Sequence, residues 1–427
     1  MTTRRTFLKQ AGTGALGLAL APTLLTRPVA PSDRLRIAHI GLNGMGNNHL
    51  GWFAALPDVD IVALCDVDQT HLDKTMARLG KLRPGTKVDG YADFRRILDR
   101  ADVDAITCAT PDHWHAQVAM LAFSAGKDVY GEKPLSFDIR EGQQMLKSLN
   151  RHNRVFQLGT QIHATDNYHR VVELIQAGAI GDVHTVRLWK TGLPPVLGPS
   201  QYQKPPATLD WDRWLGPAPY HDYTPERCHF TYRYFLDYSG GVFQDFWSHI
   251  ADVVWWALEP KGLKTVRAVG ERPDGTGDAP KTIDIDYVFD GLKLHWTSRA
   301  PDVPGAAGRG IGAYFEGTKG TLLCDYSTRE IRLGGEVLTD LPQVPKTLPR
   351  SPGHQRNFVD AVKARTQPES NLAYARRMTL PMHVGLIAYR VAPGETLDWN
   401  AGRERFRSHR AANDLIGRAY RKGWDWV

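Results

Sequence analysis

Cysteine is scarce in this 427-residue chain, which holds four cysteines far apart from one another. They lack both the close pairs of a zinc site and the dense spacing of a disulfide scaffold. We expect Cys65, Cys108, Cys228 and Cys324 to be buried thiols, and we predict no metal site. The sequence also has no internal repeat and no low-complexity tract, which argues against a repeat protein or a disordered one.

Little net charge remains once the N-terminal segment is set aside. The formal charge is +7, but residues 1–30 hold four basic residues and no acidic one, which leaves +3 for the rest of the chain. Nucleic-acid binding proteins usually carry a clear basic excess. We therefore expect no nucleic-acid partner.

The N-terminal apolar run at 11–25 is short for a membrane span and contains Gly and Pro. It follows Arg4 and Arg5, and paired arginines before such a run are typical of a twin-arginine export signal. We predict a signal peptide at residues 1–30, the twin-arginine export machinery as a partner, a periplasmic location and no stable membrane span after processing. A membrane anchor or a core helix is the alternative.

Residues 33–157 alternate short apolar runs with helix-like stretches, which is typical of a parallel α/β sheet. In residues 158–427, strand-like alternation indicates an α+β domain with a large, mostly antiparallel sheet. Self-association through such a sheet is expected, giving a homo-oligomer. The strand-like runs are 35–41, 61–65, 105–109, 128–130 and 155–158 in the first part, and 182–190, 263–269, 283–289, 291–299, 322–325 and 330–333 in the second. Between them, 192–223 is rich in Pro, Gly and Trp and is a candidate functional insertion.

A glycine-rich turn follows the first predicted strand and consists of Gly41, Asn43, Gly44, Met45 and Gly46. Such a turn lets backbone amides approach a pyrophosphate, so we predict a Rossmann dinucleotide-binding domain. Asn43 stands where the second glycine is usual, and Gly44 beside it is expected to share that task. An ordinary strand-to-helix turn is the alternative.

Asp66 follows the second predicted strand, twenty residues after Gly46. A carboxylate at this position accepts hydrogen bonds from the adenosine ribose and repels a 2′-phosphate. We therefore predict NAD rather than NADP as the cofactor. An acidic helix cap would explain the same residue without a cofactor.

Further candidates lie after the next strands, at the same edge of the sheet. We expect Thr110 to cap a helix that begins at Pro111, and His113 and His115 to lie beside the cofactor or else to be packed or solvated. Glu132 and Lys133 follow another strand. A lysine near a charged nicotinamide ring is a candidate general base, whereas a surface Glu–Lys pair is the plain alternative.

Asp245 and His249 are four residues apart and share one face of a predicted helix. There they present a carboxylate and an imidazole to one substrate hydroxyl, unless they are a first-turn acid and a core histidine. The surrounding aromatic residues suit a sugar ring, but also sheet packing or a subunit interface. They include Trp214, Tyr232, Tyr234, Tyr238 and Trp247.

These motifs, in this order and spacing, resemble the glucose–fructose oxidoreductase/inositol dehydrogenase (Gfo/Idh/MocA) family from residue 35 onward. The resemblance implies that Lys133 orients or accepts the hydroxyl proton, that His249 is an acid/base, and that Asp245 holds the substrate or tunes His249, with these roles exchangeable. The cofactor supplies the hydride chemistry.

The predicted function is that of an exported NAD-dependent oxidoreductase acting on a hydroxyl of a sugar, glycoside or polyol. Soluble NAD is scarce in the periplasm, so the cofactor is expected to stay bound between half-reactions. The alternative is an NAD-dependent glycoside hydrolase or lyase that works by transient oxidation and elimination; many relatives of that kind replace the lysine that is kept here as Lys133. A non-catalytic sugar-binding protein is the third possibility.

Overall fold

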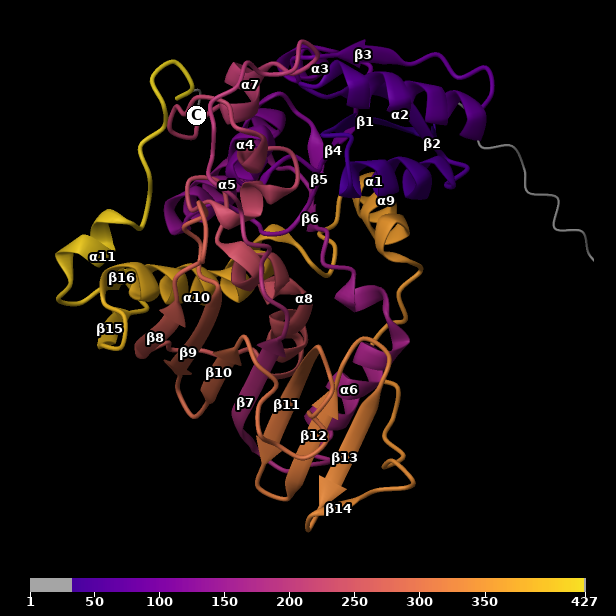
Figure 1. The fold of residues 1–427 in the computed structure, drawn as a ribbon. Helices are drawn as coiled ribbons and strands as arrows, with labels where there is room; N and C mark the ends of the chain where they lie inside the picture. The colour runs from indigo at the N-terminus through magenta and orange to yellow at the C-terminus, as the bar shows by residue number, and fades with distance from the viewer. Residues whose placement is uncertain (1–32, 426–427) are drawn as a thin grey trace, which may run out of the picture. The chain divides into compact units, whose positions relative to one another are not determined.

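Two β-sheets organise the described residues, 33–425, in the computed structural model (Figure 1). Both sheets belong to one unit, Leu35–Val427. The predicted export signal at residues 1–30 lies outside the described residues.

The first sheet is parallel throughout, in the strand order β3-β2-β1-β4-β5-β6. This order is that of a dinucleotide-binding Rossmann fold and confirms the predicted α/β class. β4 is buried along its whole length, as expected for a central strand of a parallel sheet. The strands are β1 (Leu35–Ile40), β2 (Val59–Cys65), β3 (Asp89–Tyr91), β4 (Ala105–Cys108), β5 (Asp128–Gly131) and β6 (Phe156–Leu158).

Helices connect the strands of the first sheet, and side-chain caps fix where two of them begin. The Asp68 carboxylate accepts a hydrogen bond from the Thr70 amide at the start of α2, and the Asp138 carboxylate accepts one from the Glu141 amide at the start of α5. The helices are α1 (Met45–Ala54), α2 (Gln69–Leu82), α3 (Arg95–Leu98), α4 (His115–Ser124) and α5 (Ile139–His152), with the 3₁₀ turn η2 (Asp112–Trp114) before α4.

The predicted cap at Thr110 is wrong. Helical structure begins two residues later, at η2, and Pro111 precedes that turn with ψ of 152°, which is not helical. β4 ends at Cys108 and the chain bends at Thr110, so an extended Pro111 separates the strand from η2.

The second sheet has the strand order β14-β13-β12-β11-β7-β10-β9-β8-β15-β16. The β7–β10 pair is parallel and the other described pairs are antiparallel, which confirms the prediction of a mostly antiparallel sheet. The strands are β7 (Val183–Lys190), β8 (Thr265–Glu271), β9 (Thr282–Val288), β10 (Lys293–Thr297), β11 (Ile311–Gly317), β12 (Gly320–Cys324), β13 (Arg329–Leu333), β14 (Glu336–Val337), β15 (Thr396–Asn400) and β16 (Arg405–Phe406).

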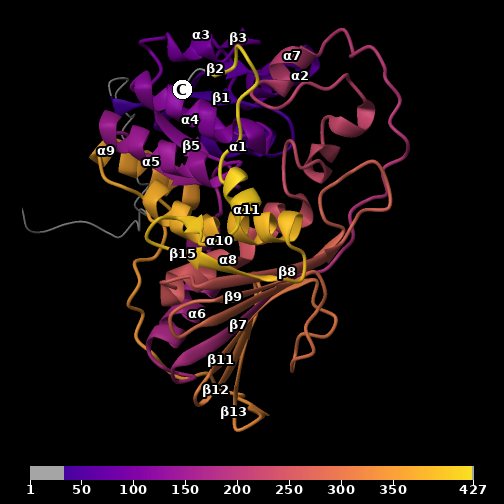
Figure 2. The ribbon, with the colours of Figure 1, turned by 90° about the vertical axis from the view of Figure 1, so that its left-hand side faces the viewer.

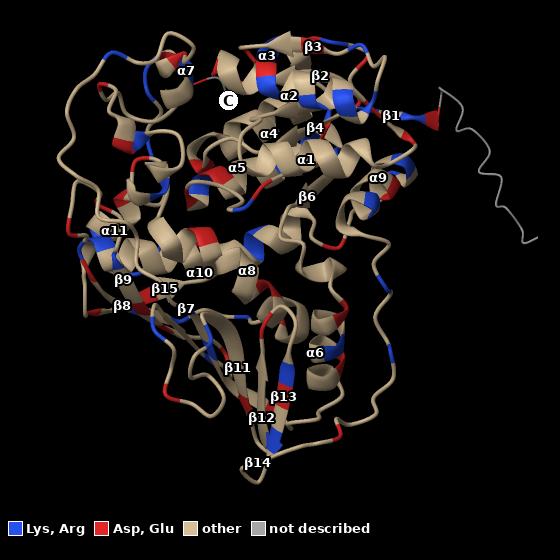
Figure 3. Cartoon of the chain, turned by 45° about the vertical axis from the view of Figure 1, so that its right-hand side comes forward, with Lys and Arg blue, Asp and Glu red and all other residues tan. Residues whose placement is uncertain are grey.

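Helices cover one face of the second sheet, and the other face carries charged residues beside a small buried apolar cluster that includes Trp189, Tyr314 and Leu323. Trp247 of α8 packs on Tyr287 and Trp296, with ring centroids 5.8 Å apart in both pairs. On the opposite face, Arg187 pairs with Glu316 across two strands at 2.7 Å, and charged residues mark these strands in Figure 3. The helices are α6 (Asp166–Gln176), α7 (Trp211–Leu215), α8 (Gly241–Leu258), α9 (His354–Ala364), α10 (Leu372–Val391) and α11 (Arg410–Asp414), with the 3₁₀ turns η3 (Ile162–Ala164), η4 (Pro225–Arg227) and η5 (Thr231–Tyr234).

Two late segments return to the first sheet. Helix α9 lies beside α1 in Figure 1, where Phe358 packs edge-on against Phe53 and Tyr130. Near the end of the chain, Trp424 meets Trp114 edge-on at 5.6 Å. Segments from the C-terminal part of the chain therefore pack on the first sheet and help to hold it.

The four cysteines are free, as expected, and three of them are buried while Cys228 is half-buried. Burial raises the pKa of Cys108 to about 11, so this thiol is protonated and unreactive at neutral pH. Among residues 33–425, no helix is both long and apolar enough to cross a bilayer.

Candidate active site

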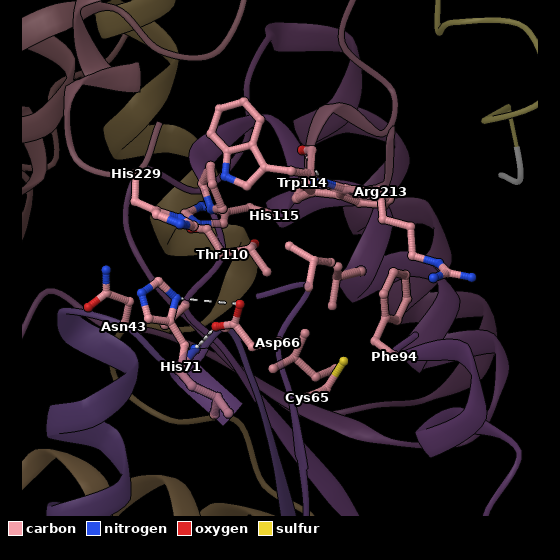
Figure 4. A pocket seen from close by; sticks show the side chains of 18 of the residues that line it. Asn43, Cys65, Asp66, His71, Phe94, Thr110, Trp114, His115, Arg213 and His229 are labelled. Carbon is pink, nitrogen blue, oxygen red and sulfur yellow. Dashed lines mark hydrogen bonds and ion pairs between the residues drawn. The ribbon is translucent and has the colours of Figure 1, made fainter. Parts of the chain in front are cut away.

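A pocket of about 310 Å³ lies at the carboxyl ends of β1, β2, β4 and β5 (Figure 4). Strands β1 and β4 are neighbours in the sheet but far apart in sequence, and ligands of doubly wound folds bind at such a switch point. Of the predicted cofactor residues, the lining includes Gly41, Asn43, Gly44, Met45, Asp66, Thr110, Pro111, His115, Glu132 and Lys133.

The glycine-rich turn is shaped for close backbone contact. A Cβ at Gly41 would lie 2.6 Å from the Ala109 carbonyl oxygen, and one at Gly46 only 1.8 Å from the Gly41 oxygen. Gly46 does not line the pocket, but its missing side chain allows the tight packing of the turn on itself. Gly44, with φ of 48°, has open space where a Cβ would stand. These features fit a dinucleotide, whose pyrophosphate needs bare backbone at a helix N-terminus.

Asp66 is fixed at the end of β2 by the backbone around it. Its two carboxylate oxygens accept hydrogen bonds from the Leu42 amide at 2.8 Å and the Asp68 amide at 2.9 Å. The side chain is 9% exposed and lines the pocket, where His71 faces it at 3.7 Å. An acid is thus held beside the glycine-rich turn, as NAD binding requires.

Lys133 and Asp245 come together although 112 residues separate them. Lys133 Nζ donates to Asp245 Oδ1 at 2.5 Å and to the Asp245 carbonyl oxygen at 3.1 Å. Arg233 Nε lies 3.5 Å from the same carboxylate oxygen. Burial alone would raise the pKa of Asp245, but Lys133 and Arg233 more than offset it and hold that pKa below its usual range. Asp245 is therefore ionised at neutral pH.

His249 lies one helical turn beyond Asp245 on α8. Burial, with a further contribution from the positive charge of Lys133, lowers the pKa of His249 to about 4. The imidazole is neutral at pH 7, so one ring nitrogen is available to accept a proton. Asp245 and His249 do not line the pocket themselves, whereas Lys133 does and joins them to it.

Glu132 anchors the loop that carries Lys133. His49 Nε2 lies 2.9 Å from Glu132 Oε1 in the interior, and the other carboxylate oxygen accepts a hydrogen bond from the Lys133 amide at 3.2 Å. A Cβ at Gly159 would lie 2.6 Å from Glu132, so a glycine is needed there. Although Glu132 lines the pocket, its carboxylate is engaged in holding α1 and the Lys133 loop together.

The two predicted histidines at this edge of the sheet, His113 and His115, differ in whether they line the pocket. His115 lines the pocket, and its ring nitrogens contact the carbonyl oxygens of Pro134 at 2.6 Å and Thr110 at 2.9 Å. The prediction of His113 beside the cofactor is corrected by the structure, because His113 is fully buried and contacts the Trp214 carbonyl oxygen at 3.0 Å. It lies on the inner side of the η2 turn, where it packs between aromatic rings.

The Pro-, Gly- and Trp-rich segment 192–223 crosses from the second sheet to the pocket. The Asp210 amide donates to the Val67 carbonyl oxygen, and the Gln69 amide donates to the Thr208 carbonyl oxygen, both at 2.9 Å. Figure 2 accordingly shows α7 beside α2, far from the strands of the second sheet. Trp214 of α7 lines the pocket, so the segment forms one of its walls.

Most of the aromatic residues in this region serve packing. Trp214, Tyr232, Tyr238 and Trp247 are all buried, and the Trp247 indole donates to the Met378 carbonyl oxygen at 2.8 Å. The packing alternative therefore describes these residues, although Trp214 and Tyr232 also line the pocket.

Several pocket residues escaped the sequence analysis, among them Arg233, His71, His229 and Trp424. His229 Nε2 lies 3.0 Å from Asp68 Oδ2 across 161 residues, and its ring meets that of His71 at 4.5 Å. Asp66 raises the pKa of His71, whereas burial lowers that of His229. None of these residues stands in a recognisable local motif, so only the folded chain identifies them.

Comparison with known proteins agrees with this geometry. Residues 35–160 match the oxidoreductase family's NAD-binding Rossmann fold, and residues 190–426 match the same family's C-terminal alpha/beta domain. A curated relative, a glycosyl hydrolase family 109 protein of Shewanella pealeana, is 26% identical over 200 residues. That match covers 42% of this chain and 44% of the relative, less than half of either protein.

Solved structures share the fold at low sequence identity. The WlbA dehydrogenase from Bordetella pertussis, in complex with NADH and UDP-GlcNAcA, aligns with a TM-score of 0.65 and 16% identity over 86% of this chain and 99% of that one. Levoglucosan dehydrogenase, in complex with NADH and levoglucosan, aligns with a TM-score of 0.62 and 18% identity. That alignment covers 86% of this chain and 99% of that one. The two family matches span most of the chain, and the chain therefore belongs to the Gfo/Idh/MocA family of oxidoreductases.

Proposed function

We propose that this protein is an NAD-dependent oxidoreductase that transfers hydride to and from a hydroxyl-bearing carbon of a sugar, glycoside or polyol. One observation carries the proposal: Lys133, which lines the dinucleotide pocket, is paired at 2.5 Å with Asp245, one helical turn from the neutral His249. Lys133 at the pocket thus has a carboxylate beside it and a proton acceptor one helical turn further along α8.

The pocket residues suit NAD in particular. The turn at Gly41–Met45 would receive the pyrophosphate, and Asp66 would accept hydrogen bonds from the adenosine ribose. The two nearby arginines are paired with carboxylates of their own, Arg95 with Asp93 and Arg213 with Asp210, each at 2.5 Å. They are therefore poorly placed to compensate a 2′-phosphate. When bound, a nicotinamide cofactor supplies the two-electron transfer at the substrate carbon.

The chain's own residues would manage the proton. His249, neutral at pH 7, accepts the proton of the substrate hydroxyl during oxidation and returns it during reduction. Lys133 donates a hydrogen bond that orients the same oxygen, and Asp245 holds Lys133 in place. Because the three groups are coupled, the roles of Lys133 and His249 are open to exchange.

Two findings support a sugar-like substrate. The WlbA dehydrogenase and levoglucosan dehydrogenase, which share this fold, were solved with UDP-GlcNAcA and levoglucosan. The donors and acceptors at Lys133, Arg233 and Asp245 also match the hydroxyl groups of a sugar or polyol.

A second candidate function is NAD-dependent cleavage of a glycoside by transient oxidation and elimination. The curated relatives named as glycosyl hydrolase family 109 proteins favour it. The same residues serve both reactions in their first step, so the products distinguish them. A nitrophenyl glycoside releases nitrophenol only if the glycosidic bond breaks.

The first test is mass spectrometry of the purified, undialysed protein for bound NAD(H), followed by addition of glucosides and polyols. Lasting reduction of the bound cofactor, reversed by a carbonyl acceptor, supports the oxidoreductase. Release of nitrophenol without lasting reduction supports glycoside cleavage, and absence of any nucleotide contradicts both.

Variants then separate catalysis from sugar binding alone. Lys133→Ala should abolish turnover, whereas Lys147→Ala, which removes an exposed lysine on α5, should leave it unchanged. Equal turnover in both variants would refute the proposed role of Lys133.

Export, location and assembly complete the proposal. Arg4 and Arg5 support twin-arginine export to the periplasm with the cofactor retained between half-reactions. Replacing both arginines by lysine should leave the protein in the cytoplasmic fraction. The large second sheet supports a homo-oligomer, and a strict monomer in size-exclusion chromatography would contradict it.

A further inference from the structure

Two histidines that line the pocket, His71 and His229, lie close to the carboxylate of Asp68. Asp68 caps α2, His71 lies in the first turn of that helix, and His229 comes from the loop that contains η4 and η5. Each offers one ligand atom, and the three atoms lie within 4.8 Å of one another. Figure 4 shows His71 and His229 on the same side of the pocket, close to Asp66.

The surroundings of the three residues are those of a metal site. Asp68 Oδ1 is occupied by the Thr70 amide at 2.9 Å, while Oδ2 lies 3.0 Å from His229 Nε2. His71 turns Nδ1 towards Asp66 Oδ1 at 3.7 Å, which leaves Nε2 for another partner. Metal-binding histidines characteristically face a carboxylate with the nitrogen that does not bind the metal.

We propose that Asp68, His71 and His229 bind one divalent transition-metal ion, with Zn²⁺ as the representative. Two imidazoles and one carboxylate are the donors that such ions prefer, and Ca²⁺ or Mg²⁺ would call for more oxygen ligands. Tetrahedral ligands about 2.0–2.1 Å from a zinc ion lie roughly 3.3 Å apart. The 3.0 Å pair is already near that spacing, and the other separations, all within 4.8 Å, would have to shorten by side-chain rotation when an ion binds. The fourth position is left for water.

The ion would join two parts of the pocket wall. His229 belongs to the second half of the chain, whereas Asp68 and His71 belong to the Rossmann domain. Phe230 and Arg233, from the same loop as His229, also line the pocket. A bound ion would therefore fix this loop over the Asp66 end and slow the release of the cofactor. This consequence for release rests on the proposed function, but the ion site does not.

Calorimetric titration of the metal-free, full-length protein with Zn²⁺ tests the site. We expect one ion per chain, and binding weakened roughly 100-fold or more in His71→Ala and in His229→Ala. The matched control is His184→Ala, which removes an exposed histidine on β7 and should bind as the wild type does. Titration with Co²⁺ should give the intense visible absorption of a tetrahedral site in the wild type and in the control.

Circular dichroism of each variant establishes that its fold is intact, and Asp66→Asn, which leaves all three ligands in place, should weaken binding only about tenfold. Absence of Zn²⁺ binding in the wild type would overturn the proposal. So would equal binding in the wild type and in the two ligand variants, which would indicate adventitious surface binding. A protein that binds Zn²⁺ at this site but contains no NAD would refute the proposed function while leaving the metal site intact.

Discussion

Asp245→Asn is the substitution that tests the Lys133–Asp245 pair most directly. The change keeps the size and the hydrogen-bonding oxygen of the side chain but removes its charge. Lys133 and Arg233, at 2.5 and 3.5 Å from the carboxylate, would then face each other without compensation.

The expected magnitude follows from the distance and the burial. Two unit charges 2.5 Å apart attract by roughly 6.6 kcal/mol at an effective dielectric constant of about 20. The cost of removing both groups from water offsets much of this attraction, and breaking one side of such a pair leaves a charge uncompensated. We expect the free energy of unfolding at pH 7 to fall by about 3 kcal/mol, and turnover by roughly 100-fold.

Chemical denaturation gives the stability change, and steady-state turnover gives the functional one. The matched control is Asp274→Asn, whose partner Lys281 is also 2.5 Å away, although Asp274 is 56% exposed compared with 22% for Asp245. Because solvent screens the exposed pair, the control should unfold and turn over close to the wild type. The pKa of Asp245 is lowered, so its contribution is present above the ordinary pKa of 3.8 and disappears as the pH falls through the lowered value.

Equal shifts of the unfolding free energy in Asp245→Asn and Asp274→Asn would refute the stabilising role of the buried Lys133–Asp245 pair. Turnover of Asp245→Asn at the wild-type rate would also contradict the prediction, since the pair would then have no part in holding Lys133.

Three further predictions concern stability and cofactor choice. Although burial opposes protonation, the buried carboxylate of Asp252 raises the pKa of His163 to about 9. The contribution of this pair to stability is therefore complete below pH 6.5 and is lost as the pH rises through 9. The difference in unfolding free energy between the wild type and His163→Gln, measured by chemical denaturation, should shrink over the same range. Gly216→Ala would place a Cβ 2.0 Å from the Trp114 ring at a residue with φ of 50°, and should lower the free energy of unfolding by about 2–4 kcal/mol. Gly178→Ala, whose Cβ would meet open space, should lower it by about 1 kcal/mol. Equal denaturation midpoints for the two variants would contradict this prediction. Asp66→Ser should raise kcat/KM for NADP relative to NAD by about tenfold, and an unchanged ratio in kinetic assays would remove Asp66 from cofactor selection.

The first sheet was predictable because its signals are local. Five of its strands are short apolar runs that end in a turn or a polar residue, and the glycine-rich turn follows β1 directly; the edge strand β3, a short and largely exposed segment at Asp89–Tyr91, was not predicted. The second sheet was predictable in part: alternation marks β7, β8, β9, β10, β12 and β13, whereas β11, β14, β15 and β16 were not predicted. Its order was not, since nothing in the sequences of β7 and β10 indicates that they lie side by side and parallel.

The site was predictable where motifs carry it and not where folding assembles it. Lys133 and Asp245 were found from their own segments, and the structure brings them into contact. His113 and His115 look equivalent in sequence, yet η2 turns one inward and leaves the other at the pocket. Asp68 and His229 meet across 161 residues through a loop whose path depends on the packing of α7, which leaves no local trace.

The position of Trp424 in the pocket wall orders the events of biogenesis. The glycine-rich turn and Asp66 leave the ribosome long before Trp424, and the wall they share with Trp424 exists only after that residue has been synthesised. Until Trp424 has been synthesised, a nascent chain therefore lacks part of the wall of the nucleotide pocket. Firm cofactor occupancy marks a molecule synthesised at least as far as Trp424 and fully docked, and a chain truncated before that residue would be recognisable by its loss of nucleotide.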